Sequence, residues 1–238
     1  MSTQPKTRKT IATHAVLAGL TPLIPVPVVD DLAKSFFRQR LVTSLAAAHG
    51  RVLAAGEAEA LAAERETGCL GGCVGTVVLY PLKKVFRKIF FFLEWKRAVD
   101  LTSRTYHFGY LVDHLFAERL DERTGRSAAE VGAALDAVCR EAPIKPLEAA
   151  VGATFRQSRG VVAAGASLLE RSLRRVVGRE KKKEVERAVE SVEAEEERQI
   201  EPVVTRLQRS VEAIPDEHFR RLREQLAARL ATAATSDE

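Results

Sequence analysis

The sequence is poor in cysteine, and this scarcity excludes a disulfide framework. Only 3 cysteines occur in 238 residues, which fits a reducing compartment. Glycine and proline are also scarce, at 14 and 9 residues, so the chain is not a collagen-like or low-complexity fibre. Aromatic residues make up only 6% of the chain. These scarcities leave a globular protein as the expectation.

Long uninterrupted apolar runs are missing as well. The uncharged segment Ile11 to Val29 follows a basic start, an order that imitates a signal peptide, but Pro22, Pro25 and Pro27 interrupt it. The segment Thr67 to Leu82 is uncharged but shorter than the ~20 residues of a spanning helix. We therefore expect no transmembrane helix, and an interfacial or re-entrant insertion stays open.

What the chain does contain is apolar residues at helical spacing. They make up 46% of the sequence, and alanine, valine and leucine dominate them. The pattern predicts an all-α, multi-helix bundle. Asp30 is the expected N-cap of one helix, and Ser127 to Glu130 form the capping box of another. The expected helices cover residues 11–20, 31–49, 51–66, 82–102, 106–120, 128–142 and 147–177, with 21–29 extended and 121–126 a loop.

The last sixty residues differ in character. They are densely charged, with apolar residues at helical spacing, and Pro202 is expected to begin a fresh helix. We divide the chain into a disordered tail (1–10), a helical domain (11–178) and an extension of charged amphipathic helices (179–238). The apolar residues of the extension either pack back on the domain or pair with a partner protein. They are Val185, Val189, Val192, Ile200, Val204, Leu207, Val211, Ile214, Phe219, Leu222, Leu226 and Leu230.

The net charge of +5 is unevenly distributed along the chain. Residues 1–110 hold 15 Lys and Arg against 8 Asp and Glu, whereas residues 179–238 hold 12 against 15. A basic and apolar front half is typical of proteins that contact anionic lipid headgroups. We do not expect a nucleic-acid partner, because no arginine-rich recognition helix or aromatic β-platform accompanies the charge.

The segment Leu82 to Asp100 is the most informative part of this front half. On a helix, an apolar face that ends at Leu93 lies opposite a face with large aromatics among lysines. That second face suits a membrane interface, with Trp at headgroup depth and Lys on anionic lipid; the alternative is a helix buried on both sides. With the Pro-x-Pro turn, the predicted membrane- or partner-contact residues are Pro25, Pro27, Lys84, Lys88, Phe91 and Trp95.

No catalytic, cofactor-binding or metal-binding motif is found. The glycine-rich segment Gly68 to Gly75 contains Cys69 and Cys73, but no second cysteine pair completes a zinc site. His107 and His114 are seven residues apart, without the spacing of a metal-binding helix. We expect buried small side chains at the cysteines, no cofactor, no metal and no enzymatic activity.

The segment Ala15 to Gly50 resembles a helical domain of unknown function that follows the GTPase module in some bacterial GTPases, and more loosely the EcsC-like proteins. The matching features are a small-residue helix, a Pro-x-Pro turn, an Asp, and an amphipathic helix that ends in Gly. The matching positions in this sequence are Pro25, Pro27, Asp30 or Asp31, Gln39 and Gly50. The resemblance implies an all-helical bacterial protein associated with a membrane or a GTPase. Because this chain has no GTPase motif of its own, a GTPase would be a separate partner.

Together these features predict a non-enzymatic helical protein that is cytoplasmic and peripheral to the inner face of a bacterial membrane. An anionic membrane surface is the expected partner, with a GTPase or transporter as a further one. The alternative is a helical scaffold or adaptor that recruits a partner protein through its C-terminal helices. A third hypothesis, an enzyme with an unfamiliar helical site, has no motif in its favour.

Overall fold

The computed structural model describes residues 5–24, 29–64, 87–177 and 182–232, which are mainly helical and contain no strand. Inside the helices, the side chains of 29–34, 87–92, 172–177 and 182–196 lie outside the described set. The elements are α1 (Pro5–Leu20), η1 (Thr21–Leu23), α2 (Val29–Ala48), α3 (Glu57–Ala62), α5 (Arg87–Ala117), α6 (Leu120–Thr124), α7 (Ala128–Glu141), α8 (Lys145–Gln157), α9 (Arg159–Val177), α10 (Lys182–Glu212) and α11 (Asp216–Thr232). The predicted all-α bundle is confirmed.

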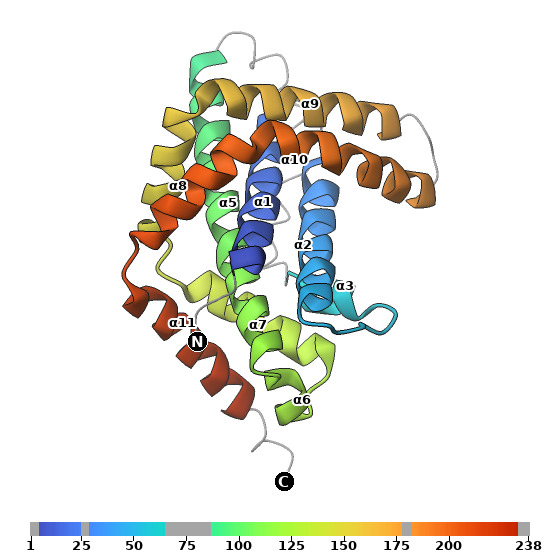
Figure 1. Ribbon diagram of the computed structural model, residues 1–238, viewed down its shortest axis with the longest axis vertical. Helices are drawn as coiled ribbons and strands as arrows, with labels where there is room; N and C mark the ends of the chain where they lie inside the picture. Colours follow the sequence, from blue (N-terminus) through green and yellow to red (C-terminus); the bar gives the residue numbers. More distant parts are fainter. Residues whose placement is uncertain (1–4, 25–28, 65–86, 178–181, 233–238) are drawn as a thin grey trace.

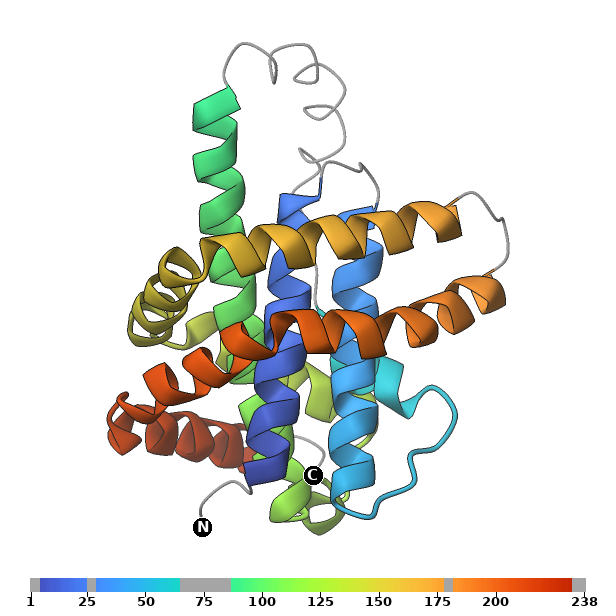
Figure 2. The ribbon, with the colours of Figure 1, turned by 45° about the horizontal axis from the view of Figure 1, so that its top comes forward.

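Helix α1 lies at the centre of the bundle, between α2 and α5 (Figure 1). The long helices α9 and α10 lie side by side and cross the same face of these three helices (Figures 1 and 2). Helices α6, α7 and α11 gather at the opposite end from the start of α5 (Figure 1). Every residue from Ile11 to Leu20 is buried, because neighbours surround α1 on all sides.

Two glycines allow neighbouring helices to approach closely. A Cβ on Gly19 of α1 would lie 2.9 Å from the carbonyl oxygen of Ala98 in α5. A Cβ on Gly132 of α7 would lie 2.2 Å from the carbonyl oxygen of Ala60 in α3. Both distances are shorter than any carbon–oxygen contact that a side chain tolerates, so the two helix pairs depend on glycine at these positions.

The start of the chain differs from the prediction. Residues 5–10, expected as part of a disordered tail, form the first turns of α1, and Pro5 occupies the first helical position, where its missing N–H is no loss. Thr7 is buried, and the Lys9 ammonium donates to Glu201 of α10 at 2.9 Å. Thr21 to Leu23 is a 3₁₀ turn rather than extended chain, and Asp30 lies inside α2 rather than before it.

The middle of the chain also differs. Of the segment expected as one helix over 51–66, residues 51–64 are described and contain only the short α3. The two helices expected over 82–102 and 106–120 are joined, over the described residues, in the single helix α5. Residues expected as a loop include α6, while the helix expected over 147–177 is divided into α8 and α9 at Ser158. The capping box is confirmed, because the Ser127 side chain accepts from the Glu130 N–H and the Glu130 carboxylate accepts from the Ser127 N–H.

The C-terminal helices pack back onto the bundle. Helix α10 contacts α1, α8 and α9, and α11 contacts α5, α6 and α7. The prediction that Pro202 begins a new helix is wrong, since α10 continues through it. Ile200, Val203 and Val204 on either side are fully buried, and this packing holds the helix together where Pro202 lacks a backbone N–H.

Candidate functional site

The predicted contact residues are described to different extents. Trp95 is fully described. Lys88 and Phe91 lie in the first two turns of α5, where only the backbone is described. Three others lie outside the described residues: Pro25, Pro27 and Lys84. The glycine-rich segment with Cys69 and Cys73 also lies outside them.

Trp95 lies on the packed side of α5. Its ring contacts Phe155 of α8 edge to face, with the centroids 5.9 Å apart, and the Arg159 guanidinium lies 5.9 Å from the ring centroid. Phe155 is fully buried, so Trp95 extends the core toward the junction of α8 and α9. Edge-to-face pairs and cation–π contacts of this kind stabilise packing by about 0.5–1.5 kcal/mol each.

The exposed side of α5 at this level carries Leu93, Lys96 and Arg97. Their spacing of three and four residues places them on one helical face. Leu93 is 48% exposed, and it is one of two large apolar side chains that the described part of the chain leaves exposed. Lys96 and Arg97 are exposed beside it. The first turns of α5 extend past α9 and beyond the other described helices (Figure 2). Leu93, Lys96 and Arg97 follow directly on these turns, so this face belongs to the projecting end of α5.

The two faces of this helix are therefore exchanged at the described positions. The sequence pattern assigns Leu93 to the inner face and offers Trp95 either to a membrane interface or to the core. In the structure Trp95 is partly buried against the core, whereas Leu93 is exposed. The cause is Phe155, which is 60 residues away in the sequence and gives Trp95 a buried aromatic partner. The local periodicity of α5 contains no information about this partner, so the sequence pattern could not reveal the inward packing of Trp95.

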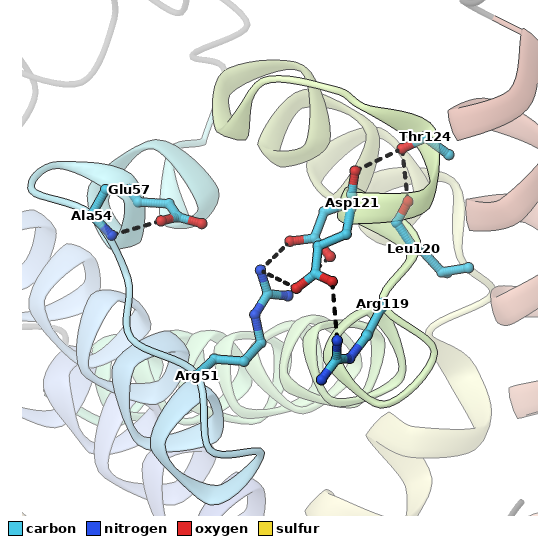
Figure 3. Close-up of polar contacts among 8 residues, drawn as sticks. Arg51, Ala54, Glu57, Arg119, Leu120, Asp121 and Thr124 are labelled. Carbon is cyan, nitrogen blue, oxygen red and sulfur yellow. Dashed lines mark hydrogen bonds and ion pairs between the residues drawn. The ribbon is translucent and has the colours of Figure 1, made fainter.

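A second polar cluster lies at the opposite end of the bundle, where α2 and α5 end (Figure 3). The Arg51 guanidinium donates to both carboxylate oxygens of Asp121, at 2.9 and 2.6 Å, and stacks over Phe116 at 4.7 Å. The hydrogen bond to Asp121 raises the pKa of Arg51. Glu57 accepts from the Ala54 N–H at 2.7 Å and so shapes the loop that carries Arg51 toward α6 (Figure 3). This bidentate ion pair fixes the α2–α3 loop to α6.

His49 and Asp113 form a neighbouring pair. Nε2 of His49 lies 2.8 Å from the buried Asp113 carboxylate. A hydrolase triad would need a hydroxyl or thiol on the other ring nitrogen, and none of the described residues supplies one. The pair joins the end of α2 to α5.

Arg38 of α2 is a buried cation in the core. It is 4% exposed, and its guanidinium carbon lies 3.9 Å from the centroid of the Phe108 ring. Nη1 donates to the Glu64 carboxylate, whereas Nε and Nη2 find no acceptor among the described residues. Buried cations need such a partner, so the Arg38–Glu64 pair ties the end of the α3 segment to α2.

The histidines and the described cysteine carry no metal site that the described residues could complete. Burial raises the pKa of Cys139 to about 12, so its thiol stays protonated at neutral pH and is not a nucleophile. Cys139 is buried, as expected of a small apolar side chain. His107 pairs with His218 of α11, a contact that the spacing of His107 and His114 did not indicate.

The large apolar residues of the C-terminal helices are buried wherever their side chains are described. Ile200, Val204 and Leu207 are fully buried under α10, and Leu222 and Leu226 are fully buried under α11. This side of the helices is occupied by the protein's own core.

Comparison with protein-family models, curated proteins and solved structures finds no match to this chain. The resemblance of residues 15–50 to the bacterial helical domain stays a prediction. In the described part of the chain, no helix has the length and apolar character to cross a bilayer. Arguments about function therefore depend on the geometry above.

Proposed function

We propose that this protein associates peripherally with an anionic membrane, on the inner face of a bacterial membrane, and that the projecting end of α5 makes the contact. The observation that carries the proposal is the exposed Leu93 with Lys96 and Arg97 on one face of that end. Trp95 supports the contact from behind by holding α5 against α8.

An exposed leucine beside two cations matches the chemistry of a membrane interface. The leucine leaves water for the boundary between headgroups and acyl chains, while the long stems of lysine and arginine extend to the headgroup phosphates. Each cation near an anionic leaflet contributes about 1 kcal/mol at low salt. The basic excess of residues 1–110 adds a longer-range attraction toward the same surface.

The elements that flank the predicted Pro-x-Pro turn fit the same orientation. Helix α2 begins, and η1 ends, at the end of the bundle from which α5 projects (Figures 1 and 2). The Pro-x-Pro turn stands between these two elements in the sequence. A GTPase or transporter at the same membrane remains part of the proposal, on the strength of the resemblance alone.

The adaptor alternative loses support from the packing of the C-terminal helices. A partner that used their apolar side would have to displace α10 or α11 from the core, because the described residues of that side are buried. We therefore favour the membrane proposal.

The test is a flotation assay with vesicles of phosphatidylcholine and phosphatidylglycerol. The double variant Lys96→Glu, Arg97→Glu removes two attractive charges and adds two repulsive ones, so it should bind at least about thirty-fold more weakly, the equivalent of ~2 kcal/mol. Arg123→Glu with Arg209→Glu is the matched control, since both arginines are exposed and the change in net charge is the same.

The control variant should retain most of the wild-type binding. Leu93→Ser should weaken binding at high salt as much as at low salt, because it removes an apolar contribution. Equal losses in the two charge variants would show that net charge, not the end of α5, governs binding. Full binding by the Lys96→Glu, Arg97→Glu variant would contradict the proposal.

A further inference from the structure

Two histidine rings meet edge to edge between α5 and α11. Nε2 of His107 lies 2.8 Å from Nε2 of His218, and the ring centroids are 5.0 Å apart. His107 is fully buried and His218 is 9% exposed. The two residues are 111 positions apart in the sequence, so the contact exists only while α11 is docked.

This contact accommodates one proton and no more. A hydrogen bond between two imidazoles needs one Nε2 that carries hydrogen and one that accepts it. Nδ1 of His107 is buried without a partner among the described residues. A bare acceptor is less costly there than an unpaired N–H, so we assign the shared proton to Nε2 of His107. If His218 becomes cationic, both Nε2 atoms carry hydrogen and face each other at 2.8 Å. If His107 becomes cationic, its second N–H is on Nδ1, which is buried without an acceptor among the described residues.

The surroundings offer no compensation for such a cation. The charged groups that act on His107 are His218 and Arg104, and both disfavour a positive charge on it. On α11, the Glu217 carboxylate next to His218 is already bonded to Arg220 and Arg221.

The other elements packed near α11 bring their charged groups elsewhere. Glu141 of α7 binds Arg229, and Arg126, which follows α6, donates to the Leu230 carbonyl at 2.8 Å; both contacts lie at the far end of α11. At the end of α10, Glu212 faces Arg8 of α1 at 3.7 Å.

We propose that the His107–His218 contact is an acid-sensitive latch, and that protonation of the pair releases α11 from the bundle while the rest of the fold stays closed. Release would expose the apolar side of α11 and the surface that it covers on α5 and α7. That side consists of Phe219, Leu222, Leu226 and Leu230.

The direction of the pH dependence follows from the burial of the pair. Burial lowers the pKa of His107 from 6.5 to about 3, and it lowers the pKa of His218 as well. The released state binds more protons than the docked state, so docking is fully stable above pH 6.5 and weakens as the pH falls below that value. Between pH 7.5 and 5.5 the opening constant of α11 should rise about tenfold if one histidine titrates on release, and about a hundredfold if both do.

Hydrogen exchange measured by mass spectrometry tests the latch in the full chain. Protection factors, corrected for the intrinsic pH dependence of exchange, are compared between pH 7.5 and 5.5 for peptides from α11 and from α1. The proposal expects protection in α11 to fall tenfold or more, while α1 stays at least tenfold better protected than α11 at pH 5.5 because it does not open with α11. Unchanged protection in α11, or equal protection of α1 and α11 at pH 5.5, would overturn it.

Two variants separate the latch from general acid sensitivity. His107→Gln with His218→Gln keeps polar groups at the contact but removes both titrating rings, so protection in α11 should no longer depend on pH over this range. His14→Gln is the matched control. His14 is also buried, with a pKa lowered to about 4 by burial, but it lies on α1. The control should respond like the wild type, and the same pH response in both variants would overturn the proposal.

Discussion

Replacing Gly132 by alanine tests the close packing of α7 against α3. The new Cβ would lie 2.2 Å from the Ala60 carbonyl oxygen and 3.2 Å from the Leu61 Cα. An ordinary contact between carbon and oxygen is about 1 Å longer than the first distance, so the backbone of α3 must move. Because the obstructing atom belongs to the backbone, no rotamer change relieves the clash.

The expected loss of stability is the difference between opposing contributions. Alanine in a helix interior is better than glycine by about 1 kcal/mol, whereas overpacking costs typically 1–3 kcal/mol and occasionally more. If the short α3 detaches instead, the loss is the burial of Leu61, about 1.5–3 kcal/mol. The two routes together predict a net loss of about 1–3 kcal/mol in the free energy of unfolding.

Urea unfolding followed by far-UV circular dichroism measures this loss, and Gly152→Ala provides the control. Gly152 is also a buried mid-helix glycine, but its Cβ would meet Arg156 Nη1 at 3.7 Å and Val99 Cγ1 at 3.9 Å, which are ordinary contacts. This control should be stabilised by about 0.5–1 kcal/mol. A Gly132→Ala variant as stable as the wild type, or changes of the same sign in both variants, would refute the packing described here.

Three further substitutions test single contacts by urea unfolding. Ser127→Ala removes the half of the capping box in which the Ser127 side chain accepts from the Glu130 N–H, and it should cost about 1 kcal/mol. An unchanged midpoint would mean that the cap is not formed in solution. Arg51→Lys loses the bidentate geometry with Asp121 and should cost about 1 kcal/mol. Adding Asp121→Asn should cost less than the sum of the two single losses, because both substitutions break the same ion pair. Glu64→Gln leaves the buried Arg38 without its carboxylate and should cost about 1–3 kcal/mol, so a neutral result would contradict the pairing.

Local signals in the sequence predicted the elements whose causes are local. The capping box at Ser127 begins α7, and α11 begins directly after Pro215. The spacing of Leu222, Leu226 and Leu230 predicted an amphipathic helix, and all three are buried. Short-range hydrogen bonding and helical periodicity are sufficient in each case.

The features that local signals missed depend on distant partners. Trp95 packs toward the core because its ring contacts Phe155 of α8. Helix α10 continues through Pro202 because the residues on either side of it are buried. The latch joins His107 to His218 across 111 positions. Such contacts arise only when the helices are placed in three dimensions, so spacing along one helix cannot reveal them.

The candidate site shows the same division. The proposed contact lies on the helix that the sequence analysis singled out, since the basic and apolar segment that begins near Leu82 continues into α5. The sequence did not identify the exposed group, because Leu93 was assigned to the inner face. The exposure of Leu93 beside Lys96 and Arg97 came from the packing of Trp95 on the other side.

Vesicle binding by the wild-type protein is the most direct test of the membrane proposal. Co-sedimentation is measured with vesicles of pure phosphatidylcholine and with vesicles that contain phosphatidylglycerol, at low and at high salt. We expect binding to the anionic vesicles that weakens steeply with salt, and little binding to the zwitterionic ones. Absence of binding to anionic vesicles at low salt would contradict the proposed function.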